Sequence, residues 1–357
     1  MITLDSIKIE NFRGFDSLEI KGLSKINLFV GKNNSGKTSI LESIFLLLGM
    51  SNPILPSNVN KIRGLGIGTQ LGLSKQLKYL FHNLNLNNKP SFHSKFSDTS
   101  ERKLELEVKF KHNEFSNENS SISVPEINGI ELNFEIKKKQ VPKKSFKSSL
   151  IFENDDKVIA PSIPKNYIEN LYATFIPADV KDNNNALLRY SEIIKRKGGD
   201  SILKAIQVFD DNIISIQPLN DGIYFNVKNI EELIVSNVMG DGIRRFLTII
   251  TAVTEKQDAF VCIDEIENGL HYSAYKLLWK NLLSFIDQND VQLFIATHNI
   301  ETLGSLKSVL EETDFENMQD FAKVFTVAKT EKVGFQVYKY SFKEFQTAID
   351  NDIEIRK

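Results

Sequence analysis

One stretch near the N-terminus carries the residue types that hold phosphate. The sequence from Gly31 to Thr38 reads Gly-Lys-Asn-Asn-Ser-Gly-Lys-Thr and fits the pattern GxxxxGK[ST] in full. Glycines let backbone N–H groups close around phosphates at a helix N-terminus, Lys37 supplies a positive charge, and Thr38 offers a hydroxyl to Mg²⁺. A simple glycine turn would explain the two glycines but not the Lys-Thr pair. We therefore expect nucleotide contacts from Gly31, Asn33, Asn34, Ser35, Gly36, Lys37 and Thr38.

Two carboxylates follow an apolar run far downstream, where Phe260–Ile263 leads directly into Asp264 and Glu265. A carboxylate at the end of a buried parallel strand lies at the sheet edge that also holds the phosphate loop, so Asp264 can support Mg²⁺ there. Glu265 points the other way and can polarise an attacking water. Either residue alone could belong to an ordinary acidic turn, but the pair together with the upstream loop favours a catalytic site.

A histidine ends another apolar run, Phe294–Thr297. Taken alone, His298 could be a helix-capping or core histidine. Its place at the same expected sheet edge as Asp264 favours a second interpretation, in which it contacts the γ-phosphate.

A second glycine turn, formed by Gly240, Asp241 and Gly242, stands immediately before a helical pattern that begins at Ile243. The free N–H groups at a helix start favour anions. Because the chain already has one phosphate cradle, this second anion site is most simply explained if it completes the nucleotide site of another subunit.

Apolar patterning predicts the elements that must position these residues. Nearly continuous apolar runs are typical of parallel strands covered on both faces, and they occur at 260–263, 291–296 and 324–328. The segment 25–30 enters the phosphate loop as a further strand. Helical patterns occupy 38–48, 243–253, 274–286 and 300–310, and a last helix begins at Ser341 with capping-box spacing.

The middle of the chain has a different pattern. Apolar and polar residues alternate strictly at 104–110 and 130–136, which predicts antiparallel strands with one wet face. Apolar residues at helical spacing precede them over 73–84, and a short helix follows at 186–197 with another after it, to about residue 210. We expect one α/β P-loop NTPase head over 1–357, with a nucleotide-binding core at 1–50 and 220–357 and an inserted lobe of antiparallel strands and helices at 51–219.

Composition narrows the class of protein. The formal net charge is −2, which excludes a generally polyanion-coating surface and leaves nucleic-acid contact to a local patch. A single cysteine excludes a disulfide framework and suits a reducing compartment. The charged N-terminus lacks a secretory signal, and no apolar run approaches the ~20 residues that span a bilayer. We expect a cytoplasmic protein with no membrane contact.

One local patch is conspicuous, because six lysines and Phe146 fall between Lys137 and Lys147. This cluster could contact a phosphate backbone. A solvated hairpin is the favoured interpretation, since charge runs are usually solvated faces. Cys262, within an apolar strand, is expected to serve packing. Trp279 is expected in the core or at a dimer surface.

The order of these motifs, opening with Ile9–Gly14, resembles the ABC-type ATPase heads of the SMC/RecF and OLD (overcoming lysogenization defect) families. Within them the chain is most similar to the OLD-like AAA-family ATPases of prokaryotic anti-phage systems, such as the ATPase subunit of PARIS. The resemblance implies that two heads sandwich two ATP molecules, each held by the phosphate loop of one subunit and the signature helix of the other. It therefore implies a homodimer or a higher homo-oligomer.

The same resemblance implies residue roles. Lys37 and Thr38 would bind phosphates and Mg²⁺, Asp264 would support Mg²⁺, Glu265 would be the general base and His298 the switch histidine. Glu267–His271 falls where the family has its dimer-contacting D-loop. Arg13 matches an arginine that approaches the nucleotide in related heads, and an exposed turn arginine is an equally open interpretation.

Two departures from the family pattern stand out. The signature loop of related heads offers a serine hydroxyl to the γ-phosphate, and Gly240–Gly242 has none. Asp241 would bring a negative charge near the triphosphate unless it points outward or pairs with Arg244 or Arg245. A Q-loop glutamine has only two candidates, Gln207 and Gln217.

The residues after His298 bear on the effector. OLD nucleases carry a TOPRIM nuclease domain after the ATPase, and residues 299–357 leave no room for another domain of ~100 residues. We therefore expect an ATP switch whose effector, a nuclease or toxin, is a separate protein. The alternative is an ATP-gated DNA-binding repair protein of RecF type that uses Lys137–Lys147. A small-molecule kinase or GTPase is disfavoured, because no NKxD-type guanine reader is present.

Overall fold

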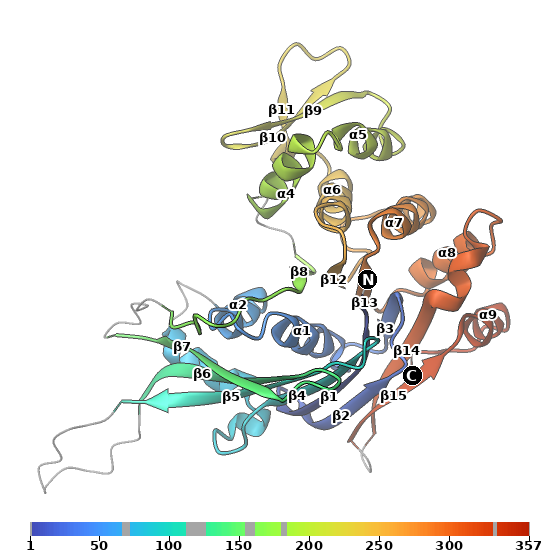
Figure 1. Cartoon of the computed structure of the whole chain (residues 1–357). Coiled ribbons are helices and arrows are strands. Elements are labelled where there is room, and N and C mark those ends of the chain that lie inside the picture. The colour runs from blue at the N-terminus through green and yellow to red at the C-terminus, as the bar shows by residue number, and fades with distance from the viewer. Residues whose placement is uncertain are drawn as a thin grey trace, which may run out of the picture.

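The computed structural model describes residues 2–65, 72–111, 126–153, 161–179, 184–330 and 334–356. Its central element is a six-stranded, mostly parallel sheet (Figure 1). The first five strands in the order below run parallel to their neighbours, and β15 closes one edge in the antiparallel direction. The order is β8 (Tyr172–Ile176), β12 (Ala259–Asp264), β13 (Gln292–Thr297), β3 (Ile26–Val30), β14 (Ala322–Thr330) and β15 (Gly334–Tyr340).

The continuous apolar runs of this sheet are explained by two hydrophobic cores, one on each face. In β12, Val261 and Ile263 belong to one core, whereas Phe260 and Cys262 belong to the other. Successive side chains of a strand point to opposite faces, so a strand covered on both sides must be apolar throughout. The prediction of buried strands here is confirmed, as is the packing role of the buried Cys262.

A second six-stranded sheet is antiparallel throughout and lies on one side of the parallel sheet (Figure 1). Buried apolar residues alternate with more exposed polar ones along its strands. In β5 the buried apolar residues are Leu104, Leu106 and Val108, which confirms the predicted strand. The order is β2 (Phe15–Lys21), β1 (Leu4–Phe12), β4 (Ser91–Phe96), β5 (Glu101–Phe110), β6 (Ile127–Lys137) and β7 (Lys144–Ile151).

Helix α1 (Lys37–Leu48) lies between the two sheets (Figure 1) and is buried on most sides. The opposite face of the parallel sheet is covered by α6 (Asp241–Thr254), α7 (Tyr275–Asn289) and α8 (Ile300–Leu310), and α9 (Phe342–Asp350) packs near β14 and β15. α9 begins with the predicted capping box at Ser341 and Glu344. Trp279 of α7 is fully buried, with its indole N–H bound to the carbonyl of Thr302 at 2.9 Å, so it is a core residue.

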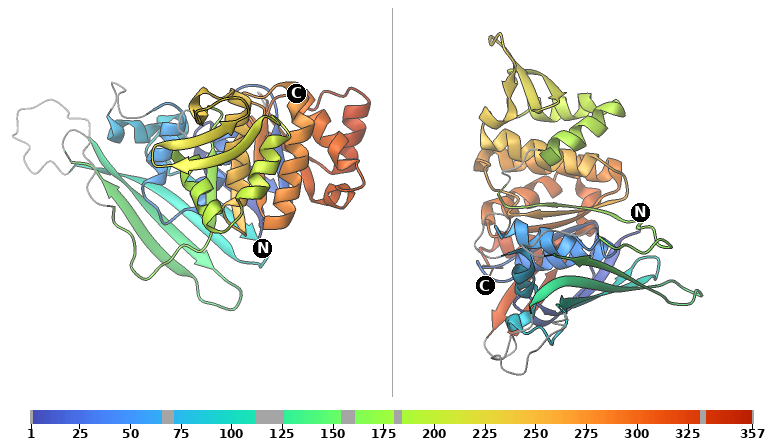
Figure 2. Two further views of the ribbon diagram at one scale, coloured as in Figure 1. Left: turned by 90° about the horizontal axis from the view of Figure 1, so that it is seen from above. Right: turned by 90° about the vertical axis from the view of Figure 1, so that its left-hand side faces the viewer.

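A third layer lies beyond α6. In the right-hand view of Figure 2, α4 (Asn184–Lys195) and α5 (Gly199–Gln207) lie between α6 and a small three-stranded sheet, and both helices contact α6 and this sheet. That sheet consists of β9 (Ile213–Leu219), β10 (Gly222–Val227) and β11 (Ile234–Val235). Two short helices, α2 (Leu55–Ile62) and α3 (Leu73–Gln76), follow α1. No helix among the described residues is both long and apolar enough to cross a membrane.

The domain boundaries expected from the sequence do not follow the sheets. β1 and β2, assigned to the core at 1–50, share a sheet with β4–β7, and β8 of the expected insertion at 51–219 pairs with β12. The boundary at 220 falls inside the hairpin of β9 and β10. The polar composition of the middle segment reflects the exposure of its strands, and strand pairing is set by long-range contacts that composition does not record.

Residues 73–84 do not form the single helix that their apolar spacing predicts. The structure forms α3 and then two 3₁₀ turns, Leu77–Leu80 and His82–Leu84. Asn83 and Leu84 have positive φ values of 52° and 57°, which an α-helix does not accommodate.

Candidate nucleotide site

The phosphate-binding loop joins β3 to α1 and needs both of its glycines. A Cβ at Gly31 would lie 2.5 Å from the carbonyl oxygen of Val327. Gly36 has a φ of +93°, and a Cβ there would lie 2.7 Å from the ring of Phe15. Gly36 is the N-cap of α1 and no side chain caps the helix, so its first N–H groups face the loop.

The remaining loop residues differ in exposure. Asn33 and Asn34 are exposed, and Asn34 has a left-handed φ of 63°. Ser35 is buried, with its backbone N–H bound to the carbonyl of Lys32 at 3.2 Å. The buried Lys37 donates from Nζ to the carbonyls of Gly31 and Lys32 at 2.9 and 3.0 Å. Burial lowers the pKa of Lys37, and the nearby carboxylates act in the opposite direction.

Thr38, at the start of α1, is in contact with Asp264, at the end of β12. The Thr38 hydroxyl donates to the Asp264 carboxylate, at 2.9 Å from Oδ2 and 3.1 Å from Oδ1. Burial raises the pKa of Asp264 to about 6, although the hydrogen bond from Thr38 favours the charged form. A hydroxyl and a carboxylate at the edge of a phosphate loop form the hard oxygen donor set that Mg²⁺ prefers, so these two residues fit the ion.

Glu265 follows Asp264 in a strained turn that a buried arginine holds. Its φ is +48°, and a left-handed conformation costs a non-glycine residue about 1–3 kcal/mol. Arg245 of α6 donates from Nη2 to the carbonyls of Asp264 and Glu265, at 2.7 and 2.9 Å. It also donates from Nη1 to the carbonyl of Pro177 at 2.6 Å. Burial lowers the pKa of Arg245 to about 10, well above neutral pH, so the guanidinium remains charged.

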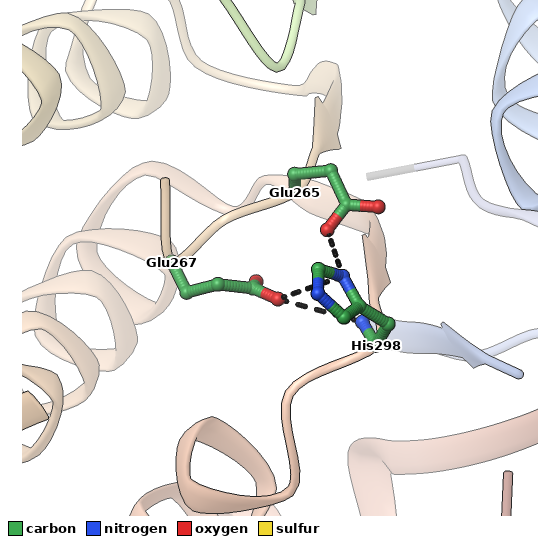
Figure 3. Close-up of side chains that lie close together, drawn as sticks. All are labelled: Glu265, Glu267 and His298. Atoms are coloured by element: carbon green, nitrogen blue, oxygen red, sulfur yellow. Dashed lines mark hydrogen bonds and ion pairs between the residues drawn. The ribbon is translucent and has the colours of Figure 1, made fainter. Parts of the chain in front are cut away.

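His298, after β13, lies against two carboxylates from the end of β12 (Figure 3). Its Nδ1 contacts Glu265 Oε2 directly and lies 3.5 Å from Glu267 Oε1. Its backbone N–H donates to Glu267 Oε1 at 3.4 Å, and its carbonyl accepts from Arg356 Nη1 at 2.8 Å. The sheet therefore brings Asp264, Glu265 and His298 to one edge.

Glu267 is a site residue that the sequence reasoning placed only in the D-loop. The carboxylate is 6% exposed and accepts from the Thr297 hydroxyl at 2.8 Å. Burial raises the pKa of Glu267. The sequence signal for this role is a third acidic residue soon after the pair Asp264 and Glu265, because a turn at a strand end can return a side chain to the same edge.

Arg13 is not the exposed turn arginine that one interpretation of the sequence expects. Its side chain is 11% exposed and its Nε lies 3.1 Å from Oε2 of Glu42 in α1. Arg63 holds the same fully buried carboxylate, with Nε 2.7 Å from Oε1. The guanidinium of Arg13 thus braces the flank of α1, and an exposed turn arginine is excluded.

The glycine turn at the start of α6 lies beside the D-loop. Gly240 is the N-cap without a side-chain cap, and a Cβ on Gly242 would lie 3.3 Å from the carbonyl oxygen of Gly269. The Asp241 side chain is 75% exposed and lies 3.5 Å from Arg244, as expected for a carboxylate that turns outward. A cavity of about 250 Å³ opens here, lined by Ala178, Asp179, Asp241, Arg244, Arg245, Asn268 and Gly269.

The two Q-loop candidates and the lysine cluster lie away from the phosphate loop. Gln207 ends α5 and donates to the carbonyl of Ile213, and Gln217 is in β9, so both belong to the third layer. The lysine cluster lies on β6, β7 and the turn between them, in the antiparallel sheet.

The sequence and the fold were compared with protein families, curated proteins and solved structures. The family model described as "AAA domain, putative AbiEii toxin, Type IV TA system" matches residues 26–304. An ATP/GTP phosphatase of Helicobacter pylori is 29% identical over 345 residues, covering 87% of this chain and 90% of the relative. The DNA replication and repair protein RecF of Lysinibacillus sphaericus is 43% identical over 44 residues, 12% of each chain. A Pyrococcus furiosus Smc head domain solved with the C-terminal domain of ScpA has 11% identity, coverage of 100% of both chains and a TM-score of 0.49.

The family model covers well over half of the chain, so the chain belongs to this AAA-domain family. Its fold is the α/β P-loop head of ABC type, with the phosphate loop after β3 and the Asp-Glu turn after β12. The protein is an ATPase.

Proposed function

We propose that this chain is a Mg²⁺-dependent ATP switch in which two copies close around ATP and hydrolysis reopens them. The observation that carries the proposal is the convergence of Thr38, Asp264, Glu265 and His298 at the carboxyl ends of β3, β12 and β13. A ligand site at this edge of an open parallel sheet agrees with the general rule for such sheets.

Each side chain has a role that its contacts support. The loop N–H groups and Lys37 hold the phosphates, and Thr38 with Asp264 holds Mg²⁺, which neutralises phosphate charge when bound. Glu265 accepts a proton from the attacking water, because it is a carboxylate beside the loop with an imidazole fixing its orientation. His298 reads the γ-phosphate, and Glu267 positions His298 through its backbone N–H.

The start of α6 supports the dimeric part of the proposal. Its uncapped N–H groups and the adjoining cavity belong to a different helix from the phosphate loop. Through the resemblance to SMC/RecF and OLD heads, this surface completes the nucleotide site of the second subunit. Asp241 turns outward toward Arg244, which limits its repulsion of a triphosphate.

Phosphate release from ATP by the purified chain tests the enzymatic part. We expect turnover with Mg²⁺, loss of turnover with EDTA, and loss of nucleotide binding in Lys37→Ala. Glu301→Gln is the matched control, because Glu301 is an exposed carboxylate at the start of α8 and should leave turnover unchanged. Undiminished ATP binding by Lys37→Ala would contradict the loop assignment.

The switch is proposed to act in an anti-phage complex that holds a separate nuclease or toxin effector. The family description, with its putative AbiEii toxin and type IV toxin–antitoxin system, and the resemblance to OLD-like ATPases support this role. Purification of wild type and Glu265→Gln from the native host, with identification of co-purifying protein, tests it. A stable, stoichiometric protein partner is expected, and recovery of the ATPase alone or with nucleic acid only would contradict it.

The second candidate is an ATP-gated DNA-binding repair protein of RecF type. The short similarity to RecF and the lysines of Lys137–Lys147 favour it. It requires ATP-dependent duplex binding that weakens steeply with salt. Neutralising Lys138 and Lys144 should then weaken duplex binding without changing the ATP requirement.

A further inference from the structure

Within the described part of the chain, the antiparallel sheet ends in a strand whose outer side is open along most of its length. β7 is the last strand in the sheet order and pairs with β6 along its length (Figure 1). On the other side, the bridge found among the described residues joins Ser149 to Ser162 through two backbone hydrogen bonds of 2.9 Å. Because edge-facing residues alternate, the backbone groups of Ser145 and Lys147 point to the same side as those of Ser149. Such an edge is a template for another strand.

A cavity of about 340 Å³ lies beside this edge, on the face toward which Lys144 and Phe146 point. Its apolar wall includes Phe96, Ile136, Val141, Phe146, Tyr167 and Leu171. The rings of Phe146 and Tyr167 are in contact, with centroids 5.0 Å apart. The cavity therefore has a packed aromatic wall suited to an apolar side chain.

The segment that crosses this face is held in place. Arg102, 6% exposed, donates to Glu169 at 2.9 Å and to Asn170 at 3.0 Å. Ile168 of the same segment nevertheless leaves 87% of its surface exposed at the cavity, and Val141 on the opposite side is 46% exposed. Exposed apolar side chains at the mouth of a cavity gain free energy when a ligand covers them.

The charged side chains around the cavity indicate which class of ligand it can bind. Three lysines of the cluster are paired with glutamates of the same sheet, Lys137 with Glu101, Lys143 with Glu135 and Lys147 with Glu131. Lys138 and Lys144 line the cavity, where Asp98 is the acidic residue. The charge left for a ligand at the cavity is therefore positive and confined to a small area.

These features favour a polypeptide over a nucleic acid. A duplex is held by several cations along a strip of phosphates. Here three of the six lysines are paired with glutamates, and Lys138 and Lys144 border a cavity that has an apolar wall. We propose that β7 and the adjoining cavity bind an extended segment of a partner protein. The segment adds as a further strand at Ser145–Lys147, places an apolar side chain in the cavity and sets acidic side chains opposite Lys138 and Lys144.

This inference deepens the proposed function by naming the surface that holds a partner, and its test does not depend on ATP hydrolysis. Random peptides displayed on phage are selected against the full chain. We expect enrichment of sequences with an apolar residue flanked by Asp or Glu. The enriched peptide, made synthetically, should slow hydrogen exchange at Ser145 and Lys147, and it should bind Lys37→Ala as tightly as wild type.

Variants at the edge locate the interaction. Ser145→Pro removes an N–H that faces the open side, a position where sheets accept proline, so it should abolish strand addition with the fold intact. Lys144→Glu and Ile168→Glu should each weaken peptide binding about tenfold, or ~1.4 kcal/mol. Lys147→Gln, on the other face of β7, is the matched control and should change affinity less than twofold. ATP turnover should be unchanged in all four variants.

Three outcomes would overturn the proposal. The first is selection that enriches no peptide, or enriches basic ones. The second is a peptide that binds Ser145→Pro and Lys144→Glu as tightly as wild type. The third is salt-sensitive duplex binding that Lys144→Glu abolishes, which would assign the surface to DNA.

Discussion

Two helix starts in this molecule share a glycine N-cap and differ in their surroundings. α1 and α6 both begin after a glycine N-cap with no side-chain cap, so each presents free N–H groups to an anion. At α1 the neighbouring Lys37 and Thr38 are engaged with the loop and with Asp264. At α6 the Asp241 side chain is 75% exposed beside an open cavity. Under the proposed function, the start of α1 is a complete phosphate site within one chain, and the start of α6 is a half-site for a second chain.

The two helices are also held differently. The buried Glu42 of α1 is gripped by Arg13 and Arg63, which fixes the helix from its flank. α6 instead sends Arg245 to the carbonyls of Asp264 and Glu265. A displacement of α6 is therefore passed directly to the turn that carries Glu265, the proposed general base. Under the proposed function, this contact links the start of α6 to the chemistry at the phosphate loop.

The largest effect is expected at the first site. Glu265→Gln should lower ATP turnover about 10²–10⁴-fold, the usual contribution of a general base, and leave ATP binding intact. Phosphate release and equilibrium nucleotide binding measure the two quantities. Wild-type turnover in Glu265→Gln would show that another group activates the water.

The brace behind α1 can be broken separately. Glu42→Ala leaves Arg13, whose side chain is 11% exposed, and the more exposed Arg63 without their carboxylate. Because the pair of Arg13 with Glu42 is buried, the loss should lower the free energy of unfolding by about 3–5 kcal/mol. Denaturant unfolding measures the change, and Glu19→Ala, at a solvent-exposed pair, is the control at about 0–1 kcal/mol. Equal losses of stability in both variants would show that the buried pairs of Glu42 stabilise the protein no more than an exposed ion pair does.

The half-site can be blocked without touching the phosphate loop. Gly242→Val crowds the carbonyl of Gly269 and should displace the start of α6 at a cost of about 1–3 kcal/mol. We expect turnover to fall roughly tenfold and nucleotide binding by the single subunit to stay unchanged. Loss of nucleotide binding in Gly242→Val would show that the two sites are not separable.

Glu267 links the two regions, because it starts the D-loop and holds His298. Glu267→Gln keeps the shape but weakens the charge-assisted contacts to Thr297 and His298, so kcat should fall about tenfold with little change in KM. A rise in KM at constant kcat would mean that Glu267 supports nucleotide binding and not the position of the histidine.

The smallest effect is expected at Asp241. Asp241→Ser removes the negative charge and supplies the hydroxyl that related signature loops offer. The ATP-bound dimer should become a few-fold more stable, about 0.5–1 kcal/mol, consistent with the loss of one exposed charge. Weaker dimerisation of Asp241→Ser would indicate that the pair with Arg244 organises the loop.

The sequence predicted that Asp264, Glu265 and His298 meet at one sheet edge, because the patterns that place them are local. Loop glycines, a Lys-Thr pair and a carboxylate at the end of an apolar strand each imply their position in the sheet. The place of β8 and the brace of Arg13 depend on contacts between residues far apart in the chain, which no local pattern records. The contact of Glu267 with His298 could not be predicted from the sequence, because it depends on the geometry of the turn that follows β12.

Under the proposed function, ATP joins two heads and hydrolysis separates them. The most direct test is the mass of Glu265→Gln in solution, measured by sedimentation with Mg²⁺ and ATP, with ADP, and without nucleotide. We predict a twofold increase in mass with ATP and the mass of a single chain in the other two conditions. A single-chain mass with ATP, or a dimer whose stability ignores the nucleotide, would contradict the account.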